Sequence, residues 1–324
     1  MADRIRWGIA ATGRIAERFV TGLHQLDDAE VVAVGSRTAE RAASFGDRHG
    51  IPRRHGGYED LAADEAVDVV YVASPHARHA ADTRLFLAAG THVLCEKPCA
   101  LDRAEGESMV AEARARGRFL MEAMWTRFLP AYVALRDLLG EQRVGDPRLV
   151  EASFGFRRPV DPLHRLFARE LGGGSLLDLG IYTAQLIASV LGHPDRIVAQ
   201  GHIGETGVDE QVVAVLHHPG GRLGVMQTAS RTVLPCSARI TGTDGWIEVP
   251  PFMHAPDHLV VGAAGVTERI EVPWEGEGLR FQAVEVHRCV RAGLTESPVM
   301  PLDETLALAG TLDAVRAEVG LAYP

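Results

Sequence analysis

Residues 4–16 read RIRWGIAATGRIA, and this stretch decides the fold of the amino-terminal part of the chain. Its first seven residues are predicted to form the first strand, with apolar residues from Trp7 to Ala10 leading into the turn. The residues that follow match the Gly-x-Gly-x-x-Gly/Ala fingerprint of dinucleotide sites, with alanine in place of the first glycine. A pyrophosphate would approach the backbone at Gly13 and the amino terminus of the next helix. The candidate coenzyme contacts are Ala11, Thr12, Gly13, Arg14 and Ile15. A tight turn with a purely structural role is the alternative.

The first 125 residues alternate strands and helices with short connections, which predicts a doubly wound parallel sheet. Strands are expected at residues 4–10, 31–34, 67–73, 92–95 and 119–124. After a helix expected at residues 176–191, several strands follow one another without helices between them, which indicates an antiparallel sheet. Beyond residue 127, strands are expected at residues 148–156, 196–203, 211–217, 222–229, 238–241, 246–249 and 266–272, and the helices at 131–139, 176–191, 281–292 and 303–319.

The predicted fold class is therefore an α/β Rossmann domain followed by an α+β domain with an open, mostly antiparallel sheet. Residues 1–125 would bind a dinucleotide, and residues 126–324 would bind substrate and form a dimer. The last helix could pack back on the first domain.

Composition excludes several classes of protein. The 324 residues carry a net charge of −10, which argues against nucleic-acid and anionic-membrane partners because both need a basic face. Four scattered cysteines without a CxxC pair fit a reducing compartment and predict no metal site. No basic leader segment and no uninterrupted apolar run of membrane-spanning length is found, so we expect a cytoplasmic protein.

The end of the second strand indicates which coenzyme is used. It reads Gly35-Ser36-Arg37, with no acidic residue where an NAD enzyme holds the ribose 2′-hydroxyl. Arg37 and Arg41 stand one helical turn apart, and two guanidinium groups favour a 2′-phosphate. We therefore predict NADP rather than NAD, with Ser36 as a further contact. A solvated arginine pair on a surface helix is the alternative.

Two later strands end in residues suited to the same sheet edge, where ligands bind in open α/β sheets. Ser74, Pro75, His76 and His79 follow one of them, and Glu96-Lys97-Pro98 follows the other. We predict that Ser74, Pro75, His76, His79, Glu96 and Lys97 face the coenzyme. For each histidine taken singly, a surface or helix-start role is the stronger interpretation.

A second motif, Gly172-Gly173-Gly174-Ser175-Leu176-Leu177-Asp178-Leu179-Gly180-Ile181-Tyr182, places two polar side chains on an otherwise apolar helix. The four-residue spacing of Asp178 and Tyr182 predicts that they share a helix face. A lysine near a phenol favours the phenolate, which suits proton exchange with a carbinol or carbonyl. We predict that Lys97, Tyr182 and Asp178 converge as the catalytic group; a hydrogen-bonded core tyrosine beside a capping aspartate is the alternative.

Together these motifs resemble the glucose-fructose oxidoreductase/inositol dehydrogenase (Gfo/Idh/MocA) family over nearly the whole chain. The segments 119–128, 205–209 and 296–302 are similar to its branch of dimeric dihydrodiol dehydrogenases, also described as NADP-dependent D-xylose 1-dehydrogenases. The resemblance implies that Lys97 and Tyr182 form the catalytic pair, that Asp178 supports them and that Arg37 contacts the 2′-phosphate. It also implies dimerisation through the open sheet.

The function predicted is NADP-dependent hydride transfer between nicotinamide and a carbinol or carbonyl of a sugar, polyol or vicinal diol. By position, the candidate substrate contacts are Trp125, Arg127, Phe154, Phe156, Arg157, Arg158 and His164. One alternative is a catalytically silent NADP-binding sensor of the same fold. A further alternative is an enzyme whose coenzyme stays bound while one substrate is oxidised and another reduced.

Overall fold

The structure is a computed structural model that describes residues 4–324. Its residues cluster into two compact units. The first contains the described residues up to 100 together with 104–125 and 275–306, and the second contains 101–103, 126–274 and 307–324. Residues 275–306, which follow the second sheet in the sequence, therefore cluster with the first.

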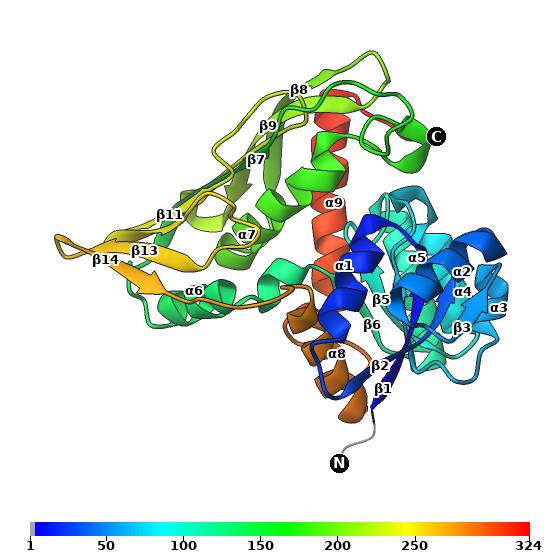
Figure 1. The fold of residues 1–324 in the computed structure, drawn as a ribbon. Helices are drawn as coiled ribbons and strands as arrows, with labels where there is room; N and C mark the ends of the chain where they lie inside the picture. Colours follow the sequence, from blue (N-terminus) through cyan, green and yellow to red (C-terminus); the bar gives the residue numbers. More distant parts are fainter. Residues whose placement is uncertain (1–3) are drawn as a thin grey trace. The chain divides into compact units, whose positions relative to one another are not determined.

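The first unit is built on a six-stranded parallel sheet (Figure 1). Its strands are β1 (Ile5–Ala10), β2 (Ala29–Gly35), β3 (Arg53–His55), β4 (Val69–Val72), β5 (His92–Glu96) and β6 (Leu120–Ala123). The spatial order is β3-β2-β1-β4-β5-β6, so the strand order reverses between β1 and β4. In open α/β sheets a ligand binds at this reversal, outside the carboxyl ends of the strands.

Helices pack on the sheet, and its strands are therefore buried on both faces. They are α1 (Arg14–Leu23), α2 (Ala39–His49), α3 (Tyr58–Ala62), α4 (His79–Ala88), α5 (Arg103–Arg116) and α8 (Arg280–Arg291). Trp7 joins two of them to β1: its ring lies 5.2 Å from Phe19 of α1, and its Nε1 donates a hydrogen bond of 2.9 Å to His287 of α8. Such contacts explain why residues 275–306 cluster with the parallel sheet.

The second unit is an eight-stranded sheet with order β14-β13-β12-β11-β7-β10-β9-β8. Its strands are β7 (Pro147–Gly155), β8 (Arg196–Ile203), β9 (Asp209–His218), β10 (Arg222–Ala229), β11 (Ala238–Gly242), β12 (Gly245–Val249), β13 (His258–Ala263) and β14 (Val266–Glu271). Its neighbours are antiparallel except for β7 and β10, which run parallel. Helix α7 (Ile181–Leu191) packs on β7 and β10 (Figure 1). Helices α6 (Pro130–Gly140) and α9 (Leu302–Val319) complete the α-helices of the described residues.

The predicted fold class is confirmed, but some elements differ from the predictions. Strand β3 was missed because its three residues are polar and carry no apolar signal, and β13 was missed beside a proline-rich loop at 250–256. A continuous α-helix over residues 176–191 was wrong, because Leu176–Gly180 forms a π-helical turn before α7 begins. Such turns are frequent at functional sites.

The stretch Arg169–Leu191 is long and apolar enough to cross a membrane if only its length and composition are considered. However, 83% of its apolar window is buried. A buried core helix gives the same pattern, so the stretch is weak support for a membrane segment.

Candidate active site

The turn after β1 lies at the edge of the sheet where the strand order reverses. Ala11 has a φ of 99°, a left-handed conformation that favours glycine. Gly13 is exposed and precedes α1, and apart from its own chain neighbours no atom of residues 4–324 lies within 4 Å of the position that a Cβ there would occupy. The open backbone next to a helix amino terminus fits a coenzyme pyrophosphate. Arg14 is exposed and Ile15 half-buried in the first turn of α1.

The end of β2 carries the residues predicted to select the coenzyme. Ser36 is buried, and its hydroxyl lies 3.4 Å from that of Thr12. Arg37 and Arg41 are both exposed around the start of α2. The pKa of Tyr58 is raised to about 12, mainly by burial and then by the charge of Asp82. The charge of Arg37 acts in the opposite direction and lowers this pKa. Arg37 follows the last residue of β2 by two positions, so it lies near the sheet edge that carries the turn after β1.

The loop after β4 contributes a second polar group to this edge. The Ser74 hydroxyl is buried and has no hydrogen-bond partner among residues 4–324. A buried hydroxyl without a partner is costly, and a bound ligand would satisfy it. Pro75 precedes a short 3₁₀ turn, His76–Arg78, as predicted for a helix start. The ring of His76 packs against that of His79, with centroids 5.6 Å apart.

His79 clamps two loops of the coenzyme edge together. Its Nδ1 lies 2.7 Å from the carbonyl oxygen of Pro98, and its Nε2 lies 2.8 Å from that of Ser74. Because carbonyl oxygens only accept, both ring nitrogens must donate, which requires the charged imidazolium. Burial opposes the charge, but Cys95 and the two carbonyls raise the pKa of His79 to about 9. His79 is thus a buried structural cation that positions the turn containing Lys97.

Lys97 occupies the turn directly after β5. Its peptide bond to Pro98 is cis, and its backbone N–H donates to Glu96 at 3.1 Å. Glu96 is buried and also accepts from the Tyr71 hydroxyl. Burial raises the pKa of the Glu96 carboxyl, although the charge of Lys97 and the Tyr71 hydroxyl oppose this shift. Lys97 is also the one lysine in the sequence, since the other basic residues are all arginine.

In the second unit, two of the three glycines before the π-helical turn have a packing role. A Cβ on Gly173 would lie 2.9 Å from three backbone carbonyl oxygens, and one on Gly174 would lie 2.1 Å from Asp209. Asp209 is buried and accepts hydrogen bonds of 2.7 Å from the Ser175 hydroxyl and from the Leu176 amide. It thereby fixes the start of the helical segment that carries Asp178 and Tyr182.

Tyr182 lies in an aromatic cluster. Its ring centroid is 5.4 Å from that of Phe154 and 6.4 Å from that of His254. Phe154 stacks on His254 at 4.9 Å, with the ring planes 14° apart. Phe154, one of the predicted substrate contacts, therefore packs beside Tyr182. His254 was missed by sequence reasoning, because an isolated histidine in a loop gives no periodic signal.

Asp178 is buried and pairs with Arg165, whose Nη2 lies 3.1 Å from its Oδ2. Burial, then the charges of Arg158 and Arg165, lower the pKa of His164, while the charges of Asp161 and Asp178 oppose the shift. The structure thus adds Arg165 as the partner of the predicted residue Asp178. An arginine-rich loop was the only signal for Arg165 in the sequence.

The other predicted substrate residues are more dispersed. Phe156 and Arg157 are exposed, whereas Arg127 is buried and accepts a hydrogen bond on its carbonyl from Arg136. Trp125 belongs to the first unit, where Arg18 lies 5.7 Å from its ring. Lys97 likewise belongs to the first unit, while Tyr182 and Asp178 belong to the second. Residues 4–324 contain no cluster of three or more His, Cys, Asp or Glu side chains able to hold a metal ion.

Comparison with known proteins identifies the family. Residues 5–124 match the oxidoreductase family with an NAD-binding Rossmann fold, and residues 132–248 match the GFO/IDH/MocA C-terminal domain. The chain belongs to the Gfo/Idh/MocA oxidoreductase family. The predicted resemblance and the prediction of an NAD(P)-dependent dehydrogenase or reductase are therefore confirmed.

Similar proteins cover almost the entire chain. A human trans-1,2-dihydrobenzene-1,2-diol dehydrogenase is 40% identical over 99% of this chain and 98% of its own, and the enzyme from Bos taurus is 41% identical over the same shares. A solved 3-ketoreductase from Actinomadura kijaniata, in complex with NADP and TDP-benzene, is 28% identical with a TM-score of 0.88 and 98% coverage of both chains. An aldose-aldose oxidoreductase from Caulobacter crescentus, 24% identical with a TM-score of 0.89 and the same coverage, shares the fold.

Proposed function

We propose that this family member is an NADP-dependent dehydrogenase that oxidises a carbinol of a vicinal diol or sugar, or reduces the matching carbonyl. Bound NADP would supply the hydride acceptor or donor. The exposed Gly13 backbone, the unpartnered Ser74 hydroxyl and the arginine at the end of β2 support this coenzyme. Diol and sugar substrates are suggested by the names of the similar enzymes.

The chemistry assigned to the protein itself is proton transfer. When a carbinol is oxidised, its hydroxyl proton must leave as hydride departs from carbon, and a positioned phenolate can accept it. We assign this role to the Tyr182 oxygen, with the Lys97 ammonium favouring the phenolate and holding the substrate hydroxyl. Asp178 would orient the neighbouring groups through Arg165. Trp125, Phe154 and Phe156 would wall the substrate, and Arg127, Arg157 and His164 would hold its hydroxyls.

The observation that carries this proposal is the placement of the single lysine. Every other cationic side chain, histidines aside, is an arginine, whereas lysine offers a compact ammonium on a flexible stem, which suits holding a substrate hydroxyl beside a phenolate. This lysine lies directly after β5, at the ligand edge of the sheet, in a turn held by His79 and Glu96. A lysine that is only a solvated surface cation does not require a place at the ligand edge or hydrogen bonds that fix its turn.

The test is a double-mutant cycle on NADP⁺ reduction with trans-dihydrodiols and aldoses as substrates. Lys97→Met and Tyr182→Phe should each lower kcat by about 10²–10⁴ while NADP⁺ binding survives, and the double variant should be little worse than either. Asp178→Asn should lower kcat less. Tyr323→Phe is the matched control, because that hydroxyl donates to the Gly173 backbone and has no role in proton transfer.

Near-normal kcat in Tyr182→Phe on the best substrate would overturn the assignment, because the phenol would then be a core hydrogen bonder. Additive losses in the double variant would instead show that the two residues act separately.

We further propose that residues 1–125 act as the coenzyme domain and residues 126–324 as the substrate and dimerisation domain of a cytoplasmic homodimer. The half-exposed face of the eight-stranded sheet supports the dimer. The silent-sensor alternative predicts NADP binding without turnover on any diol or sugar, and the placement of Lys97 disfavours it. The permanently bound coenzyme predicts purified protein that already absorbs in the nicotinamide band.

A further inference from the structure

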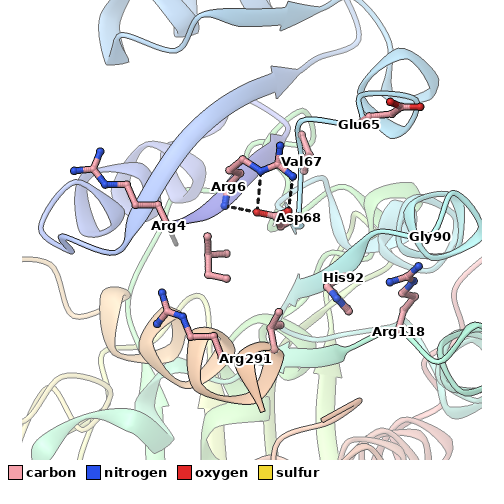
Figure 2. A pocket seen from close by; sticks show the side chains of 11 residues that line it. Arg4, Arg6, Glu65, Val67, Asp68, Gly90, His92, Arg118 and Arg291 are labelled. Atoms are coloured by element: carbon pink, nitrogen blue, oxygen red, sulfur yellow. Dashed lines mark hydrogen bonds and ion pairs between the residues drawn. The ribbon is translucent and has the colours of Figure 1, made fainter. Parts of the chain in front are cut away.

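The first unit contains a pocket at the sheet edge opposite to the coenzyme edge. It has a volume of about 490 Å³ and lies where β1, β4 and β5 begin, next to the end of α8 (Figure 2). The candidate coenzyme residues lie at or after the carboxyl ends of β1, β2, β4 and β5, so the pocket is separate from them. Its lining residues are Arg4, Ile5, Arg6, Glu65, Val67, Asp68, Gly90, His92, Arg118, Val290 and Arg291.

The charge of the lining is opposite to that of the whole chain. Four arginines and one histidine face two carboxylates, in a protein with a net charge of −10. One carboxylate is already neutralised: Asp68 accepts hydrogen bonds from the Arg6 backbone at 2.8 Å and from its guanidinium at 3.1 and 2.7 Å. The other, Glu65, is exposed at the rim. The pocket therefore keeps an excess of positive charge.

Among residues 4–324 no carboxylate pairs with the side chains of Arg118 and Arg4, whereas Arg6 pairs with Asp68 and Arg291 with Asp28. Arg4 is exposed and donates a hydrogen bond of 3.1 Å to the Asp27 carbonyl, so Arg118 is the half-buried pocket cation that no described carboxylate neutralises. Its Nη2 and Nε lie 3.6 and 3.8 Å from the position a Cβ would take on Gly90, so the guanidinium lies across that glycine. A half-buried guanidinium with free N–H groups is suited to bidentate binding of an oxyanion.

His92 presents a second donor beside Arg118. Its Nδ1 accepts a hydrogen bond of 2.9 Å from the Phe119 amide, so in the neutral ring the proton is on Nε2. Burial, and then the charge of Arg118, lower the pKa of His92, while Asp68 opposes the shift, which keeps the ring neutral near pH 7. Val67 and Ile5 add apolar surface to the same pocket. An oxyanion attached to a small apolar body would match these groups.

We propose that this pocket is a second ligand site, which binds a small phosphate monoester through Arg118 and His92 while its apolar body lies against Ile5 and Val67. This site is independent of the diol or sugar oxidation proposed above. It gives the enzyme a place to bind an anionic metabolite without displacing coenzyme or substrate.

The experiment is isothermal titration calorimetry of the full chain saturated with NADP⁺, so that the coenzyme edge is occupied. Phenyl phosphate is the probe, with inorganic phosphate and phenol as the other two arms. Wild-type protein should bind phenyl phosphate saturably, inorganic phosphate more weakly and phenol more weakly still. Arg118→Ala should weaken phenyl phosphate binding about ten- to one-hundredfold, and Arg118→Lys, which keeps the charge but loses the fork, should weaken it less.

Arg116→Ala is the matched control. Arg116 is exposed, pairs with Glu112 on α5 and does not line the pocket, so its loss should leave binding unchanged. Melting temperatures of all variants verify folding, and NADP⁺ reduction should be unaffected by Arg118→Ala. No saturable binding to wild type, equal binding of phenol, or equal losses in Arg118→Ala and Arg116→Ala would each overturn the proposal. Tighter binding of inorganic phosphate than of the ester would also overturn it, by assigning the pocket to the free ion.

Discussion

At the scale of single residues, Ala11 is the clearest place where the chain accepts a local cost. Its φ of 99° is unfavourable for any residue with a Cβ, and glycine usually stands at this position of the fingerprint. We predict that Ala11→Gly raises the free energy of unfolding of the coenzyme-free protein by about 1 kcal/mol, because relief of strain exceeds the entropy that glycine adds to the unfolded chain. Urea denaturation measures the change.

Ala10→Gly, one residue earlier in buried strand β1, is the control and should lower stability. If both changes destabilise the protein alike, Ala11 is not strained.

Arg37 decides coenzyme preference in our proposal. Loss of a charge-assisted hydrogen bond to the 2′-phosphate should make Arg37→Ala bind NADP⁺ about ten- to one-hundredfold more weakly and leave NAD⁺ binding nearly unchanged. Fluorescence titration with both coenzymes measures the two constants. Arg48→Ala, an exposed arginine nearer the end of α2, should change neither. An equal loss of affinity for NADP⁺ and NAD⁺ in Arg37→Ala would contradict the assignment.

At the scale of elements, the start of the π-helical turn depends on one buried carboxyl. Burial raises the pKa of Asp209 to about 7, against the hydrogen bonds from Ser175 and Leu176. The folded protein therefore holds this proton at pH values where the unfolded chain, with an ordinary aspartate, has lost it. The contribution of Asp209 to stability is complete below about pH 4 and is lost as the pH rises through about 7.

We predict that Asp209→Asn, which keeps the acceptor oxygen but cannot ionise, flattens this dependence. The decrease in unfolding free energy from pH 5 to pH 8 should be smaller by about 1–3 kcal/mol than in wild type. Urea denaturation at several pH values measures it, with Asp195→Asn, an exposed aspartate of the same unit, as control. Parallel pH profiles for wild type and Asp209→Asn would show that Asp209 is ionised throughout.

At the scale of the whole molecule, the predicted dimer rests on the different exposure of the two faces of the eight-stranded sheet. One face is buried, while the other carries a row of paired residues, Val198, Val215 and Val225, that are exposed or half-buried. Val213 on the same face is 41% exposed. Exposed valines grouped on one sheet face are a feature that an interface would cover.

We predict a dimer at micromolar concentration, and a monomer with unchanged melting temperature for Val213→Arg. Analytical ultracentrifugation distinguishes the two states. Val266→Arg, in the β14 hairpin and 67% exposed, is the control and should remain a dimer. A monomeric wild-type protein would refute the interface.

The sequence by itself determined the alternation of strands and helices, the turn at Gly13, the absence of an acid after β2 and the position of Lys97 after β5. All of these are local patterns, because periodicity and turn chemistry act over a few residues. Only the tertiary structure decided that His79 donates to two carbonyls, that Asp209 holds the start of a π-helical turn, and that no carboxylate among residues 4–324 pairs with Arg118. Those properties depend on burial and on partners such as Pro98 and Leu176, which lie 19 and 33 residues from His79 and Asp209, so no local pattern could reveal them.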